Sequence, residues 1–337
     1  MLKKGQHGGN IFKAAEALGC EASEIIDFSS NINNYRPDLD VTIAAHTFSH
    51  YGDPDYKDLK RAVASRYEVK NKEIALFNGA SSAIFELFRH LKAEETTLYT
   101  PIYSEYTRAA GLFSQKSTKI DRFDELYKKP AKRSTVVFVN PGTPDGRYYD
   151  LEKLFRLWKR QQCTIILDES FLEFTRQPSL RAEIKEYKRL YIVQSFTKFY
   201  GCAGLRVGAI FSHAKSIRAL LQPAWNLSSL DAAYVTALLE NETHSRDSIA
   251  LYQKQYKALR KTLKGSGCFE KVYKSSGNYI LTRSEQATKI YRQLFQEKIL
   301  VRDCSNFDGL DARYLRFALK DKDALKALKK ALHHACT

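Results

Sequence analysis

Short apolar runs recur along the middle of the chain and alternate with amphipathic stretches. The apolar runs lie at residues 74–77, 96–100, 136–139, 164–167, 190–193 and 207–211. Between them, residues 81–91, 151–160 and 180–188 carry apolar positions at helical spacing. Because continuous apolar runs are typical of strands buried on both faces, the pattern predicts a mainly parallel sheet covered by helices.

The pattern changes at both ends of this region. One long helical region is expected at 228–263, interrupted at 241–245, followed by strands at 270–273, 279–282, 300–302 and 314–318 and helices at 285–297 and 321–333. At the start, a short helix at 11–18 and an extended segment at 25–28 form an arm. The sequence thus predicts an α/β protein with an N-terminal arm (1–35), a large domain (36–228), and an interdomain helix with a smaller α+β C-terminal domain (229–337).

Composition and charge narrow the classes of partner. With 337 residues, of which 44% are hydrophobic, the chain can bury a sizeable core. Its net charge of +16 is compatible with nucleic acid, a membrane surface or an anionic substrate. The basic residues are scattered, which favours solvated faces over a groove for a polyanion, and the apolar runs are too short to span a bilayer. We therefore expect no nucleic-acid partner and no membrane role.

The cysteines indicate a reducing compartment. The six cysteines lack C-x-x-C spacing, and residues 1–5 lead into no apolar segment of a signal peptide. We expect reduced thiols, a cytoplasmic location and no metal site.

One stretch, residues 195–208, combines a lysine among hydroxyls with an arginine in a glycine-rich frame. A lysine that forms a Schiff base with pyridoxal phosphate needs a short polar turn, with hydroxyl and guanidinium donors for the cofactor's phosphate. Lys198 is the candidate for that lysine, and Ser195 and Arg206 are the candidate phosphate ligands. S-x-x-K alone is common on solvated loops, but the extended stretch is much more specific.

The extended stretch resembles the lysine motif of the fold-type-I pyridoxal-phosphate enzymes. The resemblance is strongest to histidinol-phosphate aminotransferases and to the threonine-phosphate decarboxylases of cobalamin biosynthesis, and it extends along nearly the whole chain. It implies a fold-type-I transferase fold, pyridoxal 5'-phosphate as the cofactor and a homodimer.

The same resemblance assigns cofactor contacts at the ends of several predicted strands. Asp168 would hold the protonated pyridine nitrogen, although an aspartate at a strand end also commonly caps a helix. Asn140 opens an N-P-x-x-P-x-G turn and would bond the phenolic oxygen. Tyr103 would stack on the pyridine ring, and the amides of Ala80 and Ser81 would hold the phosphate at a helix start.

Three positions depart from the family pattern. Ser82 stands where the family often has an acidic residue. Tyr51 matches the residue that reaches the neighbouring subunit's cofactor phosphate, but Gly52 replaces the proline that usually follows it. Phe171 stands where histidinol-phosphate aminotransferases commonly have a tyrosine that donates to the cofactor oxygen. Since phenylalanine has no donor, this change puts transamination in some doubt.

The two ends of the chain bear on the substrate. The segments around His7 and Asn31 resemble the opening of threonine-phosphate decarboxylases, and the segment from Arg302 to Gly309 resembles their small-domain signature. With Arg316, the chain offers two arginines on adjacent predicted strands, which suits a substrate with a phosphate and a carboxylate. We expect these two ends to meet over Lys198.

Three functions remain open at this point. The first is decarboxylation of O-phosphothreonine or O-phosphoserine for cobamide synthesis, and the second is a histidinol-phosphate-type aminotransferase. The third, suggested by the charge alone, is a polyanion-binding protein that keeps the fold. Which Cα bond breaks depends on the orientation of the substrate, which the sequence does not show.

Overall fold

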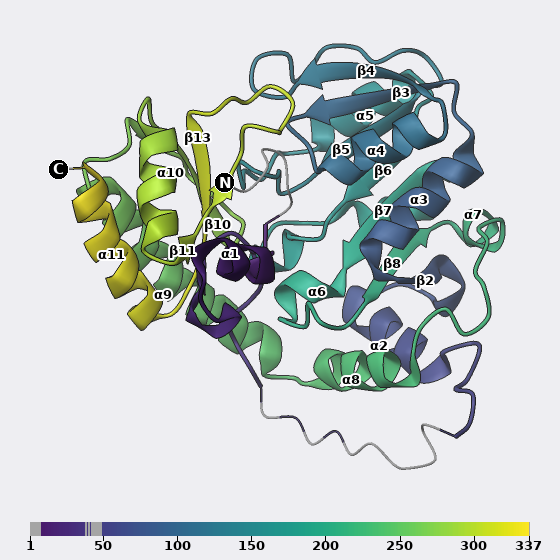
Figure 1. Ribbon diagram of the computed structural model, residues 1–337. Helices are drawn as coiled ribbons and strands as arrows, with labels where there is room; N and C mark the ends of the chain where they lie inside the picture. The colour runs from purple at the N-terminus through teal and green to yellow at the C-terminus, as the bar shows by residue number, and fades with distance from the viewer. Residues whose placement is uncertain (1–7, 38, 40, 42–48, 337) are drawn as a thin grey trace.

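The computed structural model of the chain describes residues 8–37, 39, 41 and 49–336. Its central feature is a seven-stranded sheet, here called the large sheet, with the order β2-β8-β7-β6-β5-β3-β4. The strands are β2 (Ile74–Asn78), β3 (Glu95–Thr100), β4 (Lys116–Asp121), β5 (Thr135–Val139), β6 (Thr164–Asp168), β7 (Leu190–Ser195) and β8 (Val207–Ser212). Strand β8 runs antiparallel to both its neighbours, and the other pairs are parallel. The predicted α/β fold with a mainly parallel sheet is confirmed (Figure 1).

Helices cover both faces of the large sheet. They are α2 (Lys57–Tyr67), α3 (Gly79–Leu91), α4 (Ser104–Leu112), α5 (Glu152–Arg160), α7 (Ala214–Arg218) and α8 (Ser229–Glu240). Neighbouring strand residues point to opposite faces, so Val136 packs in the core with α2, α5 and α8, whereas Val137 packs in the core with α3, α4 and α7. This two-sided burial explains the continuous apolar runs in the sequence.

A second layer is built from the C-terminal third of the chain. Its four-stranded sheet, here called the small sheet, has the order β12-β13-β10-β9. The elements are α9 (His244–Gly265), β9 (Lys271–Val272), β10 (Tyr279–Arg283), α10 (Ala287–Gln296), β12 (Arg302–Asp303), β13 (Tyr314–Ala318) and α11 (Lys322–Cys336). The three helices share one core with the strands. The expected break in the long helical region is confirmed, because α8 ends at Glu240 and α9 begins at His244.

The N-terminal arm packs against this second layer. Helix α1 (Ile11–Leu18) begins after Asn10, whose Oδ1 accepts from the Lys13 amide at 3.1 Å, and ends at Gly19 in the left-handed conformation. Strand β1 (Ile26–Asp27) pairs in parallel with β11 (Ile299–Leu300), and Phe28 is fully buried in the core of the second layer. Figure 1 shows α1 between the two sheets.

Two elements differ from the sequence-based expectation. Strand β4 was not predicted, because its side chains are mostly polar and half of them are exposed. It forms at the edge of the large sheet, where it pairs with β3. The helix expected at 180–188 is wrong, since only a short 3-10 helix (Leu180–Ile184) forms there. Within the part of the chain that the structure describes, no helix has the length and apolar character needed to cross a membrane.

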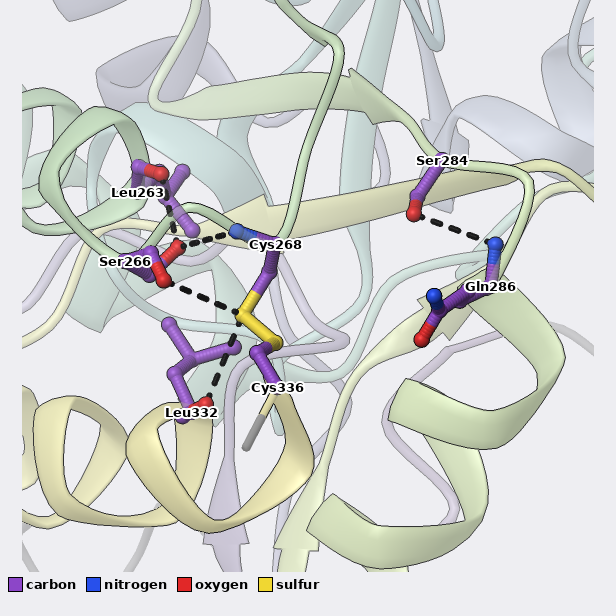
Figure 2. The surroundings of a disulfide bond; sticks show 7 residues. All are labelled: Leu263, Ser266, Cys268, Ser284, Gln286, Leu332 and Cys336. Atoms are coloured by element: carbon purple, nitrogen blue, oxygen red, sulfur yellow. Dashed lines mark hydrogen bonds between the residues drawn. A yellow bond between two sulfur atoms is a disulfide. The ribbon is translucent and has the colours of Figure 1, made fainter.

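The cysteines require a correction. Cys268 and Cys336 form a disulfide with a Cα–Cα distance of 5.5 Å, so the expectation of reduced thiols is wrong for this pair. Figure 2 shows it joining the last turn of α11 to the segment after α9. The pairing was missed because 68 residues separate the two cysteines, and folding of the second layer alone brings them together. Cys20, Cys163, Cys202 and Cys304 are free thiols.

We predict that Cys336→Ser destabilises the oxidised protein by about 4 kcal/mol, because the disulfide restricts a long loop of the unfolded chain. Thermal unfolding with and without reductant measures the effect. Cys20→Ser is the matched control, since Cys20 is unpaired. Equal melting temperatures for the wild type under both conditions, with six alkylatable thiols in the unreduced protein, would contradict the disulfide.

Candidate functional site

A pocket lies where the large sheet, the small sheet and the arm meet, and Lys198 is in its wall. Strand β7 ends at Ser195 and continues into the single turn of α6 (Phe196–Phe199), which carries Lys198. Ligands of open parallel sheets bind at such carboxyl ends. Ten of the residues predicted from the sequence line this pocket: Asn31, Ala80, Ser81, Tyr103, Asp168, Ser195, Lys198, Arg206, Arg302 and Arg316.

The surroundings of Lys198 favour its neutral amine. Protein atoms surround the amine densely, although the side chain keeps some exposed surface toward the pocket. Burial, followed by the positive charges of Arg316 and Arg206, lowers the pKa of Lys198 to about 8, against the opposing effect of Asp168. An amine that loses its proton near neutral pH is available as a nucleophile and as a proton carrier.

Asp168 is held at the end of β6 by two donors. The Ser170 amide donates to its Oδ1 at 2.9 Å, and the Tyr106 hydroxyl donates to its Oδ2 at 2.8 Å. Burial raises the pKa of Asp168, whereas these hydrogen bonds and the charge of Lys198 oppose that rise. Among the described residues that line the pocket, Asp168 is the one carboxylate and four residues are cationic.

The start of α3 and Arg206 form a compact anion cradle. Gly79 has φ of +74°, and a Cβ at this position would lie 2.6 Å from the Arg206 Nη2. A Cβ at Gly208 would collide with the Ala80 amide nitrogen. Glycine at both positions therefore lets the guanidinium and the first turn of the helix approach each other closely. Helix amides, the Ser81 hydroxyl and a guanidinium together fit a phosphate group.

The remaining cofactor candidates differ in their placement. The Ser195 hydroxyl lies in the pocket, 2.9 Å from the Thr197 hydroxyl. Asn140 is buried outside the lining, where its side chain bonds the backbone of Tyr149 at 2.9 and 3.0 Å. Its assignment to the cofactor's phenolic oxygen stays a prediction.

Tyr51 also lies outside the pocket. Its side chain is 83% exposed, and its ring centroid is 4.7 Å from that of Trp225.

Two further assignments concern residues that lie outside the pocket or outside the described residues. The assignment of Tyr51 to the cofactor of a neighbouring subunit depends on the homodimer and stays a prediction. His7 lies outside the described residues, so its assignment to the substrate also stays a prediction.

Arg302 and Arg316 are direct cross-strand partners on β12 and β13 and are both buried. The Arg316 guanidinium donates to the Thr143 hydroxyl at 3.1 Å, to the Ser29 carbonyl at 3.1 Å and to the Asn31 Oδ1 at 2.8 Å. All three acceptors are neutral, and the Arg316 Nε has no hydrogen-bond partner among the described residues. Like charges placed opposite each other are destabilising, so this arrangement favours an anion in the pocket.

Several residues of the site were missed by the sequence analysis. Tyr106 lies one helical turn after Tyr103, and this spacing was the available signal for its contact with Asp168. Asn306 accepts from the Arg302 Nη2 at 2.7 Å, and the Phe307 ring lies 5.2 Å from the Arg302 guanidinium carbon. Both were inside the resembling segment at 302–309, but only the arginine had been assigned.

We predict that the pKa of the Lys198 amine depends on the charge of Arg316. In the cofactor-free protein, labelling of Lys198 by acetic anhydride, followed by mass spectrometry, should titrate with a midpoint of about 8. Arg316→Gln removes a positive charge and should move the midpoint upward, whereas Arg316→Lys keeps the charge and should move it less. A midpoint unchanged by Arg316→Gln would refute this coupling.

Comparison with known proteins places these features in a family. The chain is 28% identical to the threonine-phosphate decarboxylase of Salmonella typhimurium, over 98% of this chain and 96% of that protein. It is also 28% identical to the adenosylcobalamin biosynthesis bifunctional protein of Leptospira interrogans, over 96% of this chain but 40% of that longer protein. The crystal structure of the histidinol-phosphate aminotransferase from Clostridium acetobutylicum has a TM-score of 0.78 and 29% identity, over 91% of this chain and 98% of that one.

The family profile for aminotransferase class I and II matches residues 23–332, which include the whole large sheet and the small sheet. The family's cofactor is pyridoxal phosphate. The cradle of Gly79 and Arg206, the buried Asp168 and the lysine with a lowered pKa fit that cofactor's phosphate, ring nitrogen and aldehyde. The chain belongs to the class I and II aminotransferase family of pyridoxal-phosphate-dependent enzymes.

Proposed function

We propose that this enzyme decarboxylates an O-phosphorylated amino acid. The substrate is L-threonine O-3-phosphate, giving (R)-1-aminopropan-2-yl phosphate, or L-serine O-phosphate, giving ethanolamine phosphate. Such a product would supply the nucleotide loop of a cobamide. Similarity to the Salmonella decarboxylase along 98% of the chain supports this choice.

The observation that carries the proposal is the buried pair Arg302 and Arg316. The pair faces a pocket that already contains a separate cradle for the cofactor phosphate at Arg206. A phosphoamino acid brings two further anionic groups, and two guanidinium groups can bind them with paired hydrogen bonds. The pocket's excess of positive charge therefore matches a substrate that carries both a phosphate and a carboxylate.

The residues of the chain divide the work of the reaction. When bound, pyridoxal phosphate would supply an aldehyde that combines with an amine and a ring that accepts the electron pair of the bond broken at Cα. Asp168 provides the fixed negative charge that keeps the ring nitrogen protonated. Arg302 and Arg316 orient the substrate so that its Cα–carboxylate bond breaks and carbon dioxide leaves. Lys198 holds at its Nζ the proton that Cα then receives.

A second candidate is a histidinol-phosphate-type aminotransferase. The 29% identity to the Clostridium acetobutylicum enzyme favours it. In that reaction Arg316 would bind the substrate carboxylate, and Lys198 would take up the Cα proton at its Nζ. Phe171 argues against the aminotransferase. The Phe171 ring lines the pocket and packs edge-on against Tyr279, with 5.1 Å between the ring centroids, and it has no hydrogen-bond donor for the cofactor oxygen.

Lys198→Ala is expected to abolish turnover and the absorbance of the lysine-bound cofactor, because no other amine occupies the turn after β7. Absorbance spectroscopy of the purified variant, with added pyridoxal phosphate, measures this. Lys215→Ala, in α7 on the surface, is the control and should keep both properties. Wild-type absorbance in Lys198→Ala would mean that another lysine holds the cofactor.

The reaction itself is tested by offering phosphothreonine, phosphoserine and histidinol phosphate side by side and identifying the products. We expect release of carbon dioxide from one or both phosphoamino acids without any 2-oxo acid. Mixed activity is consistent with the proposal, since a pocket distinguishes one methyl group by only about 1–3 kcal/mol. Strict dependence on a 2-oxo acid, with exchange between glutamate and 2-oxoglutarate, would instead establish the aminotransferase.

A further inference from the structure

Residues 29–34 of the arm, here called the arm strap, touch both the substrate arginine and the lysine turn. Toward the small sheet, Ser29 and Asn31 accept the two hydrogen bonds from the Arg316 Nη2. Toward the large sheet, Asn33 bonds the α6 turn that carries Lys198. Within six residues the strap thus connects the two walls of the pocket.

Asn33 bonds the α6 turn through its backbone amide and its side chain. Its backbone amide donates to the Lys198 carbonyl at 2.9 Å. Its side-chain Nδ2 donates to the Phe199 carbonyl at 2.7 Å and to the Ser248 hydroxyl of α9 at 2.8 Å, and its Oδ1 accepts from the Tyr35 amide at 3.1 Å. The residue is buried, with 5% of its surface exposed. A buried side-chain amide with these three contacts has a single favourable orientation.

The contacts of Asn33 strengthen the end of the α6 turn, which has only four residues. Within the turn's own continuation, the Gly201 amide donates to the Lys198 carbonyl at 3.4 Å, a longer contact than the one that Asn33 makes. Asn33 binds the carbonyls of Lys198 and Phe199, two neighbouring peptide groups at the end of this turn. The strap can pass this closely because position 201 is glycine: a Cβ there would lie 2.9 Å from the Asn33 carbonyl oxygen. A shift of Asn33 would therefore move the backbone from which Lys198 projects.

We propose that Asn33 is a positioning residue for Lys198, and that the arm strap links the anion site at Arg316 to the lysine turn. Asn33 orients Lys198 through the backbone and does not itself touch the reacting atoms. The part of this proposal that connects the arm strap to substrate binding at Arg316 rests on the proposed decarboxylase function. The part that concerns the orientation of Lys198 requires only that the enzyme binds pyridoxal phosphate.

The test compares Asn33→Ser with Asn34→Ser in the holoenzyme. Asn34 is the matched control, because its amide also makes a strap contact, to the Leu319 carbonyl at 2.8 Å, but none to the α6 turn. We expect Asn33→Ser to shift the pH midpoint of the lysine-bound cofactor's absorbance. We also expect it to lower kcat about tenfold or more while KM changes less, since small misplacements of catalytic groups are costly. Asn34→Ser should keep the wild-type midpoint.

The melting temperature of each variant separates positioning from general destabilisation. If both variants lose similar melting temperature and Asn33→Ser keeps the control's absorbance midpoint and kcat, the proposal is overturned. Ser248→Ala removes one hydrogen-bond acceptor of the Asn33 side chain and serves as a milder variant. We expect it to shift the absorbance midpoint less than Asn33→Ser does. An unchanged midpoint in Ser248→Ala would contradict the proposal. The absorbance titration needs no substrate, so it remains decisive even if the decarboxylase reaction is not found.

Discussion

The main physical constraint on the structure is that, in the described part of the pocket wall, four basic side chains surround one buried carboxylate. Lys198, Arg206, Arg302 and Arg316 share a pocket wall with Asp168, and this charge imbalance is costly to bury. Its effect is visible within the protein, since Arg316 and Arg206 contribute to the lowered pKa of Lys198. The same imbalance that favours a neutral lysine also favours anionic ligands. The cofactor chemistry and the anionic substrate that we propose therefore depend on one electrostatic arrangement.

The fold creates this arrangement by bringing together chain segments that are remote in sequence. The carboxyl ends of β6 and β7 supply Asp168 and the lysine turn, and the close packing of β8 on the start of α3 supplies the phosphate cradle. The small sheet adds the remaining arginines from paired strands, and the arm closes the space between the sheets. Since Arg316 bonds both Thr143 of the large-sheet side and Asn31 of the arm, a single guanidinium joins all three parts.

Sequence reasoning succeeded where a local pattern carries the information. The buried strands of the large sheet, the capped helix at 11–18 and the lysine turn at 195–208 are each specified within a few residues. It failed where distant contacts decide the outcome. The polar edge strand β4 forms because β3 pairs with it, the Cys268–Cys336 disulfide forms only after the second layer has folded, and Tyr106 acquires its role from the hydroxyl contact with Asp168. The placement of Asn140 against Tyr149 likewise depends on the loop between them, because the two residues are nine positions apart in sequence.

The residues that would hold the cofactor differ from those that would select the reaction. Lys198, Asp168 and the phosphate cradle would serve decarboxylation and transamination equally well, because both begin with the same cofactor held in the same way. What differs is the orientation of the substrate about Cα, and among the described residues our proposal assigns that role to Arg302, Arg316 and the strap residue Asn31. These groups lie on the small sheet and the arm. Under the proposed function, reaction specificity should therefore follow the position of the arm and the small sheet relative to Lys198, and the hydrogen bonds of Asn33 directly link the arm to the lysine turn.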